Sequence, residues 1–192
     1  MANVIKLRKG LDVNLKGKAA KEEFQVKKPA VYALMPDDFT GMKPKVVVKE
    51  NDVVKVGDSL FVDKNHPEIK FVSPVSGRVT MVERGDRRKV LSVRVEADAE
   101  QQYVDFGKKN VGQMTAQEVK DLLLESGLFG FFRQRPYDVT ANPSDTPKAI
   151  FVSAFNSMPL AADFEYVLRG READFQAGLD ALAKMAKTYL GV

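Results

Sequence analysis

Short stretches of β-branched and apolar residues, separated by turns, fill residues 43–96. Three of these stretches lie between turns that contain Asn, Asp or Gly, at residues 46–48, 53–56 and 60–62. Runs this short, bounded by turn residues, are typical of β-strands. Almost nothing in the region follows the 3.6-residue period of a helix. The pattern predicts a small all-β unit.

A Gly-Asp turn occurs twice in this unit. Gly57-Asp58 and Gly85-Asp86 lie 28 residues apart, and each follows one alternating strand and precedes another. Two similar halves that cannot each bury an apolar face alone are expected to pack together with approximate twofold symmetry. The pattern predicts a barrel-sandwich domain over residues 43–96, like that of biotinyl and lipoyl carriers, preceded by an N-terminal extended segment at residues 1–42.

The strand pattern stops where residues 97–146 begin, a stretch predicted to be a linker with one helix. Thr115 and Glu118 have the spacing of a capping box, in which each side chain satisfies a backbone N–H of the first turn. Apolar residues at helical spacing follow, and Gly127 can end the helix. These signals predict a helix over residues 116–126.

Residues 147–192 have the pattern of a strand, a helix and a second strand. We expect a buried strand at 148–154, an amphipathic helix at 172–187 and a final strand at 188–192. This is the start of a βαβ crossover, which needs a larger parallel sheet covered on both faces. The chain is thus expected to be of mixed α+β and α/β class, with a truncated βαβ domain or one stabilised by strand pairing between copies.

The residue inventory excludes several kinds of site. With no cysteine, the chain has no disulfides, iron–sulfur clusters, thiolate zinc sites or thiol nucleophiles. A single histidine, His66, rules out a multi-histidine metal site, and its polar, turn-like surroundings predict a solvated loop residue. The sequence therefore indicates no metal site and no catalytic residue.

The formal net charge of +4 is small, and acidic and basic residues are interleaved along most of the chain. Nucleic-acid binding therefore has little electrostatic support. Cations are concentrated only at residues 6–9 and 84–89, and both runs are expected to be solvated turns. No stretch is long and apolar enough for a signal peptide or a membrane helix, which predicts a soluble protein with at most a peripheral membrane role.

Lys64 is the candidate for a carrier function. Carrier domains hold their modified lysine at the tip of a tight hairpin, and Asp63-Lys64 is the nearest match to that position. The residues that follow, 65–68, make this hairpin longer and bulkier. We therefore expect a carrier-like fold used for packing, and keep a biotin- or lipoate-carrying domain as the alternative.

Aromatic residues and arginines cluster between residues 128 and 137. Such a cluster could stack nucleic-acid bases or line a quinone pocket, but phenylalanines this close in sequence are usually buried. We therefore expect core packing for the aromatic side chains of this run, which are Phe129, Phe131 and Phe132, beside Arg133 and Arg135.

The segment between the predicted strand and helix of the third unit, residues 155–164, contains no glycine. A phosphate-binding loop needs glycines there, because backbone N–H groups must approach the phosphate closely. We therefore expect no nucleotide-phosphate site in this segment, and the residues identify no other cofactor-binding position.

Several stretches together resemble the A subunits of the bacterial sodium-translocating NADH:quinone reductases. They occur in order and with similar spacing over essentially the whole chain, at residues 5–12, 41–44, 63–64, 71–77, 128–136, 148–154 and 159–161. Members of this family are much longer than 192 residues, in keeping with the expected truncation of the βαβ unit.

The resemblance implies a peripheral subunit on the cytoplasmic, inner face of the bacterial membrane, in a complex that oxidises NADH, reduces ubiquinone and exports Na⁺. It implies that NADH, flavins and an iron–sulfur centre are bound by other subunits, that those subunits are the partners, and that ubiquinone is a candidate ligand.

The family fold is similar to that of the flavin-binding peripheral subunit of respiratory complex I, in which an acidic loop after the first βαβ strand helps hold flavin and NADH. Here the corresponding loop keeps Asn156 and Pro159 but lacks the carboxylates. The resemblance therefore implies that the cofactor site has been lost and that this part of the chain serves assembly. A flavin- or NADH-binding domain is the third possibility.

Overall fold

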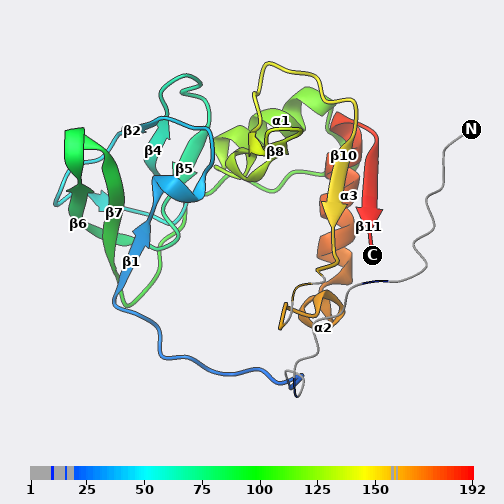
Figure 1. Cartoon of the computed structure of the whole chain (residues 1–192), viewed down its shortest axis with the longest axis horizontal. Coiled ribbons are helices and arrows are strands. Elements are labelled where there is room, and N and C mark those ends of the chain that lie inside the picture. Colours follow the sequence, from blue (N-terminus) through cyan, green and yellow to red (C-terminus); the bar gives the residue numbers. More distant parts are fainter. Residues whose placement is uncertain (1–9, 11–15, 17–19, 157, 159) are drawn as a thin grey trace, which may run out of the picture.

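The computed structural model of the chain describes residues 10, 16, 20–156, 158 and 160–192. Along the chain it forms a β barrel, a region with one helix, and a βαβ unit (Figure 1). Figure 1 shows the barrel and the βαβ unit at opposite ends of the molecule, with helix α1, Ala116–Glu125, between them. The basic run at residues 6–9 lies outside the described residues.

The barrel consists of two antiparallel sheets. One has the strand order β1-β7-β6-β3, and its strands are Val31–Leu34, Val90–Ala97, Gly77–Arg84 and Val53–Val54. The other has the order β2-β4-β5, from Pro44–Val46, Ser59–Asp63 and Lys70–Val72. Apolar side chains of both sheets share one core, which includes Val54, Leu60, Phe61, Ile69, Phe71, Val79, Val93 and Val95. The predicted barrel-sandwich fold is confirmed.

Strand β1 lies ahead of the region in which we expected the barrel. It pairs antiparallel with β7, which sets Val31 opposite Glu96 and Leu34 opposite Val93. A 3₁₀ turn, Pro36–Asp38, follows it. The described part of residues 1–42 therefore contributes a barrel strand, which the sequence pattern did not indicate because four half-exposed residues are too few to reveal a period of two.

The connector from β5 to β6, residues 73–76, leads from one sheet to the other and is buried except at Pro74. Ser73 and Ser76 are buried, and their hydroxyls are satisfied locally. The Ser73 hydroxyl donates to the carbonyl of Val75 at 2.6 Å, and the Ser76 hydroxyl accepts the backbone N–H of Gln102 at 2.9 Å. Small hydroxyl residues therefore let the chain cross the barrel without unpaired polar groups.

The region expected to be a linker also packs on the barrel. Val56 forms a parallel bridge with Tyr103. The expected helix is present as α1, Ala116–Glu125, with both hydrogen bonds of the capping box, and its Val119 is buried. A 3₁₀ turn, Val111–Gln113, precedes it. The proposed domain limits at residues 96 and 146 stay a prediction, because the barrel and this region share contacts.

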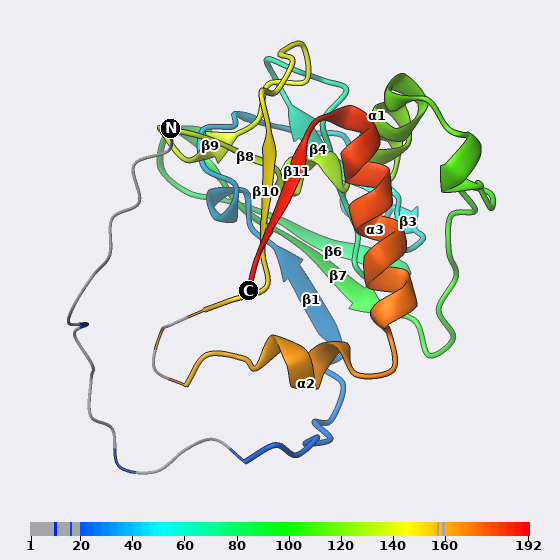
Figure 2. The same cartoon turned by 90° about the vertical axis from the view of Figure 1, so that its right-hand side faces the viewer.

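The C-terminal unit has the predicted strand-helix-strand order. Strands β10, Ile150–Ser153, and β11, Thr188–Gly191, pair in parallel, and helix α3, Glu172–Met185, packs on one face of the pair (Figure 2). A further short helix, α2, Phe164–Leu168, precedes α3. On β10 and β11 the exposed rings of Phe151 and Tyr189 stack 5.2 Å apart. In the part of the chain that the structure describes, no helix has the length and apolar character needed to cross a membrane.

Gly77 provides a direct test of the barrel crossing. A Cβ at this position would overlap the carbonyl oxygen of Glu96 on the neighbouring strand. We expect Gly77→Ala to lower the free energy of unfolding by about 3 kcal/mol, because backbone cannot move aside as a flexible side chain can. Gly178→Ala in α3 is the matched control, since no atom lies within 4 Å of the added Cβ. Urea unfolding followed by circular dichroism should show this control unchanged or slightly stabilised.

The capping box predicts a pH dependence of stability. The Glu118 carboxylate accepts the backbone N–H of Thr115 at 2.7 Å and its hydroxyl at 2.9 Å, and these bonds lower the pKa of Glu118. A depressed folded-state pKa stabilises the fold above the unfolded-state pKa, and this contribution is lost as pH falls through the folded-state value.

We therefore expect Glu118→Gln to melt below the wild type near neutral pH, at about pH 7, and the difference to disappear at about pH 3. Melting curves over this range check it. A difference in melting temperature that stayed constant with pH would contradict the assignment.

Candidate functional site

Lys64 lies in the loop between β4 and β5, and its backbone is tied to the neighbouring chain. Asp63 is buried, and its carboxylate accepts the backbone N–H groups of Lys43 at 3.2 Å and Asn65 at 3.0 Å. The N–H of Lys64 donates to the carbonyl of Lys43 at 2.7 Å. The side chain of Lys64 is exposed, but the acidic residue beside it is used to hold the loop and is not presented at the surface.

The buried residue Ile69 anchors the rest of the loop. Ile69 is buried, its N–H donates to the carbonyl of His66 at 2.9 Å, and its own carbonyl accepts the N–H of Asp63 at 3.1 Å. His66, expected to be solvated, is partly exposed, with Nδ1 3.6 Å from Oε1 of Glu68. The loop is thus wider than a tight hairpin tip, as the sequence predicted.

The aromatic run forms a 3₁₀ turn, η4, at Phe129–Phe131. Phe129 is buried and Phe132 packs against the barrel core, as expected. The expectation was wrong for Phe131, which is 67% exposed and lies edge-on to the ring of Phe39, at a centroid separation of 5.6 Å. In a 3₁₀ turn, residues three apart share a face, so Phe129 and Phe132 turn inward together and Phe131 cannot.

Close packing against β5 explains the two glycines around this turn. A Cβ at Gly127 would lie 2.6 Å from Val72 Cγ1, and one at Gly130 would lie 2.7 Å from Phe71 Cε1. Gly127 also has a φ of +76°, which favours glycine. The turn is therefore fitted to the edge of the barrel.

The neighbouring arginines do not converge with the phenylalanines on a pocket. Arg133 begins the short strand pair β8, Arg133–Gln134, and β9, Val139–Thr140, and donates to the carbonyl of Asp38 at 2.9 Å. Arg135 lies 3.8 Å from the Asp138 carboxylate on the surface. This arrangement fastens a hairpin and does not build a stacking platform.

The loop after β10 also satisfies its own polar groups. The side chain of Asn156 accepts the N–H of Met158 at 3.0 Å. Pro159 lies outside the described residues. Asp163 caps α2 by accepting the N–H of Tyr166 at 3.1 Å, and its carboxylate is 2.6 Å from the Lys21 ammonium, which holds the pKa of Asp163 below its usual value. A carboxylate already occupies this helix N-terminus, so a phosphate would meet negative charge there.

A further hollow lies on the surface beside α3. A hollow of 480 Å³ between Val111–Gln113 and α3 has Asp180 and Lys184 in its wall, and the Lys184 ammonium donates to the carbonyl of Gly112 at 3.0 Å. Among the residues that the structure describes, no group of three or more His, Asp or Glu side chains could hold a metal ion.

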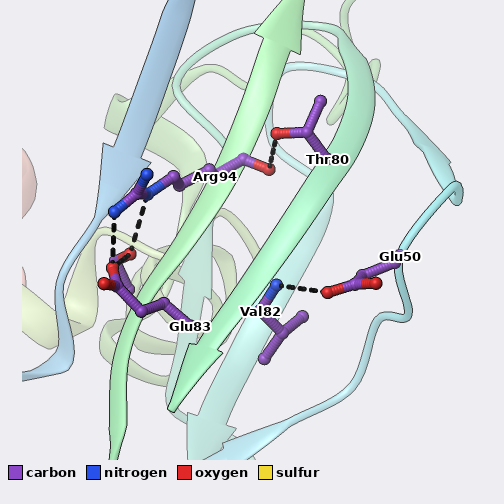
Figure 3. Close-up of polar contacts among 6 residues, drawn as sticks. Glu50, Thr80, Val82, Glu83 and Arg94 are labelled. Atoms are coloured by element: carbon purple, nitrogen blue, oxygen red, sulfur yellow. Dashed lines mark hydrogen bonds and ion pairs between the residues drawn. The ribbon is translucent and has the colours of Figure 1, made fainter. Parts of the chain in front are cut away.

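The sequence analysis missed a polar cluster on strands β6 and β7 (Figure 3). The Glu83 carboxylate accepts the Ser92 hydroxyl at 2.8 Å and the Arg94 guanidinium at 2.6 Å, and both bonds, the serine's first, lower the pKa of Glu83. On the opposite side of β6, the N–H of Val82 donates to Glu50 at 3.3 Å. The two-residue spacing of Ser92 and Arg94 on one strand was the available signal, but their partner depends on the register of β6.

Two family models match the chain in consecutive order. The NqrA N-terminal barrel-sandwich hybrid domain matches residues 5–98, and the NqrA second alpha/beta domain matches residues 114–192. These matches cover the barrel, and then α1 with the βαβ unit.

Curated relatives carry the same family name. The A subunit of the Na(+)-translocating NADH-quinone reductase of Pseudomonas aeruginosa (strain UCBPP-PA14) is 35% identical over 190 residues, which is 97% of this chain and 42% of that protein. Those of Yersinia pseudotuberculosis (serotype O:1b) and Serratia proteamaculans are 36% and 37% identical over 186 residues, 95% of this chain and 41% of theirs. The chain therefore spans about two fifths of the length of these relatives, and together the fold, the two domain matches and the identity show that it belongs to the NqrA family, the A subunits of the Na(+)-translocating NADH-quinone reductases.

Proposed function

We propose that this chain is part of a peripheral subunit of a bacterial sodium-translocating NADH:quinone reductase, where it serves assembly and carries no redox centre. The two consecutive NqrA domain matches carry the proposal. The assembly role is supported at Lys64, because Asp63 and the backbone around it are engaged within the fold. The capped loop after β10 supports the same interpretation, since Asp163 blocks the end of α2.

In such a complex NADH is oxidised, a quinone is reduced and Na⁺ is exported, and flavins and an iron–sulfur centre belong to other subunits. This chain has no cysteine and so supplies no thiolate ligand to a cluster. The proposed partners are those other subunits, ubiquinone is a candidate ligand, and the proposed location is the inner face of the bacterial cell membrane.

Copurification tests the assembly role. We expect the full-length subunit, expressed from its own genome with an affinity tag, to retain the membrane subunits of the reductase after mild detergent extraction. The tag alone on an unrelated soluble protein is the control. Isolation of the tagged subunit without any reductase subunit, under conditions that keep the complex active, would refute the proposal.

Intact-mass measurement tests the carrier alternative at Lys64. After coexpression with biotin ligase or with lipoate ligase, we expect the mass of the unmodified polypeptide, because the wide, anchored loop differs from a tight hairpin tip. A mass gain that is abolished by Lys64→Arg would instead establish a carrier function.

A further inference from the structure

The tip of the β6–β7 hairpin places two arginines in a backbone conformation that arginine rarely adopts. Within the turn Asp86–Arg88, Arg87 has φ 53° and ψ 30°, and Arg88 has φ 60°. Lys89 N–H closes the turn on the carbonyl of Asp86 at 3.1 Å. A turn with positive φ at both central residues is the type I′ turn, for which Asn-Gly is the preferred pair.

Nothing in the fold requires arginine here. Arg87 and Arg88 are exposed, and in the described part of the chain neither forms an ion pair. Among the described residues, the strained backbone is therefore not explained by burial or by an ion pair of either side chain. Strain of this kind at an exposed position is expected where the side chains have a task outside the fold.

Two hydrogen bonds and one ion pair hold the backbone of the tip in place. The N–H of Gly85 donates to the carbonyl of Lys89 at 2.8 Å, and the Arg84 guanidinium donates to the carbonyl of Arg88 at 3.3 Å. The Lys89 ammonium lies 2.6 Å from the carboxylate of Asp37, in the turn after β1. The two exposed guanidinium groups therefore project from a backbone whose position is fixed.

Side-chain contacts also join strands β6 and β7 next to the turn. The cluster of Glu83, Ser92 and Arg94 joins β6 to β7 directly beneath the turn (Figure 3). Glu83 forms an ion pair with Arg94, and Asp37 forms one with Lys89. Of the remaining charged residues between 84 and 88, three are arginines and one, Asp86, is acidic. The exposed end of the hairpin is thus positively charged.

We propose that Arg87 and Arg88 dock this hairpin onto a carboxylate-bearing surface of a neighbouring subunit. A guanidinium matches a carboxylate with two parallel hydrogen bonds, and a turn whose backbone is already hydrogen-bonded loses less backbone entropy when it binds. Membrane binding through basic segments depends on about four to eight cations. Residues 84–89 contain four, of which Lys89 is paired with Asp37, so three remain for a partner. The inference rests on the proposed function, because it requires a partner subunit.

The double substitution Arg87→Asn and Arg88→Gly separates the two effects of this turn. It supplies the preferred type I′ pair, so we expect the melting temperature to rise by about 2–4 °C. It also removes both guanidinium groups, so we expect the affinity for the partner to fall about tenfold or more. Gain of stability with loss of binding is a combination that a merely structural role would not produce.

The test uses the full-length subunit titrated onto reductase particles that lack it, with affinity read from cosedimentation. Lys27→Gln with Lys28→Gln is the matched control, since it removes two exposed cations from the segment before β1. We expect this control to bind like the wild type. Arg87→Lys with Arg88→Lys keeps the charge but not the fork of donors, and should bind with intermediate affinity.

Each other result has a defined meaning. If the wild type binds and the Asn-Gly variant binds equally well, the docking proposal is wrong and the proposed function stands. If the wild type fails to bind the particles, the proposed function itself fails. If the variant instead loses binding to vesicles of phosphatidylglycerol without any other protein present, the partner is the membrane surface and the proposal is overturned.

Discussion

Phe39, Phe61 and Phe71 pack against one another at the place where the barrel meets the rest of the chain. The ring of Phe71 lies 4.4 Å from that of Phe39 and 5.1 Å from that of Phe61. These residues come from the turn after β1 and from strands β4 and β5, and the edge of Phe71 faces Gly130 in the η4 turn. One aromatic cluster therefore joins the N-terminal strand, the smaller sheet and the segment that follows the barrel.

The position of the C-terminal unit depends on that cluster in turn. Once the η4 turn is fitted against β5, Leu123 and Leu124 of α1 come to lie against the barrel core. Helix α3 packs beside α1, and its Met185 reaches the same core. The βαβ unit is thus placed by packing that begins in the barrel, and residues 97–146 take part in that packing.

In both units the polar groups at the positions considered as cofactor sites in the sequence analysis make local hydrogen bonds. Asp63 accepts two backbone N–H groups beside Lys64, and Asp163 accepts one at the start of α2. A carboxylate that accepts backbone N–H groups stabilises the loop around it. The exposed surface includes the two arginines of the β6–β7 turn and the stacked rings of Phe151 and Tyr189.

Local signals in the sequence determined the elements that depend on neighbouring residues. The capping box at Thr115, the alternation along the barrel strands and the strand-helix-strand order at the C-terminus were all readable, because each is set by contacts a few residues apart. Tertiary structure alone decided that β1 joins the barrel, that Phe131 faces outward while Phe129 is buried, and that Glu83 meets Arg94. These outcomes depend on strand register and on which surfaces meet, and residues distant along the chain leave no periodic trace of such contacts in the sequence.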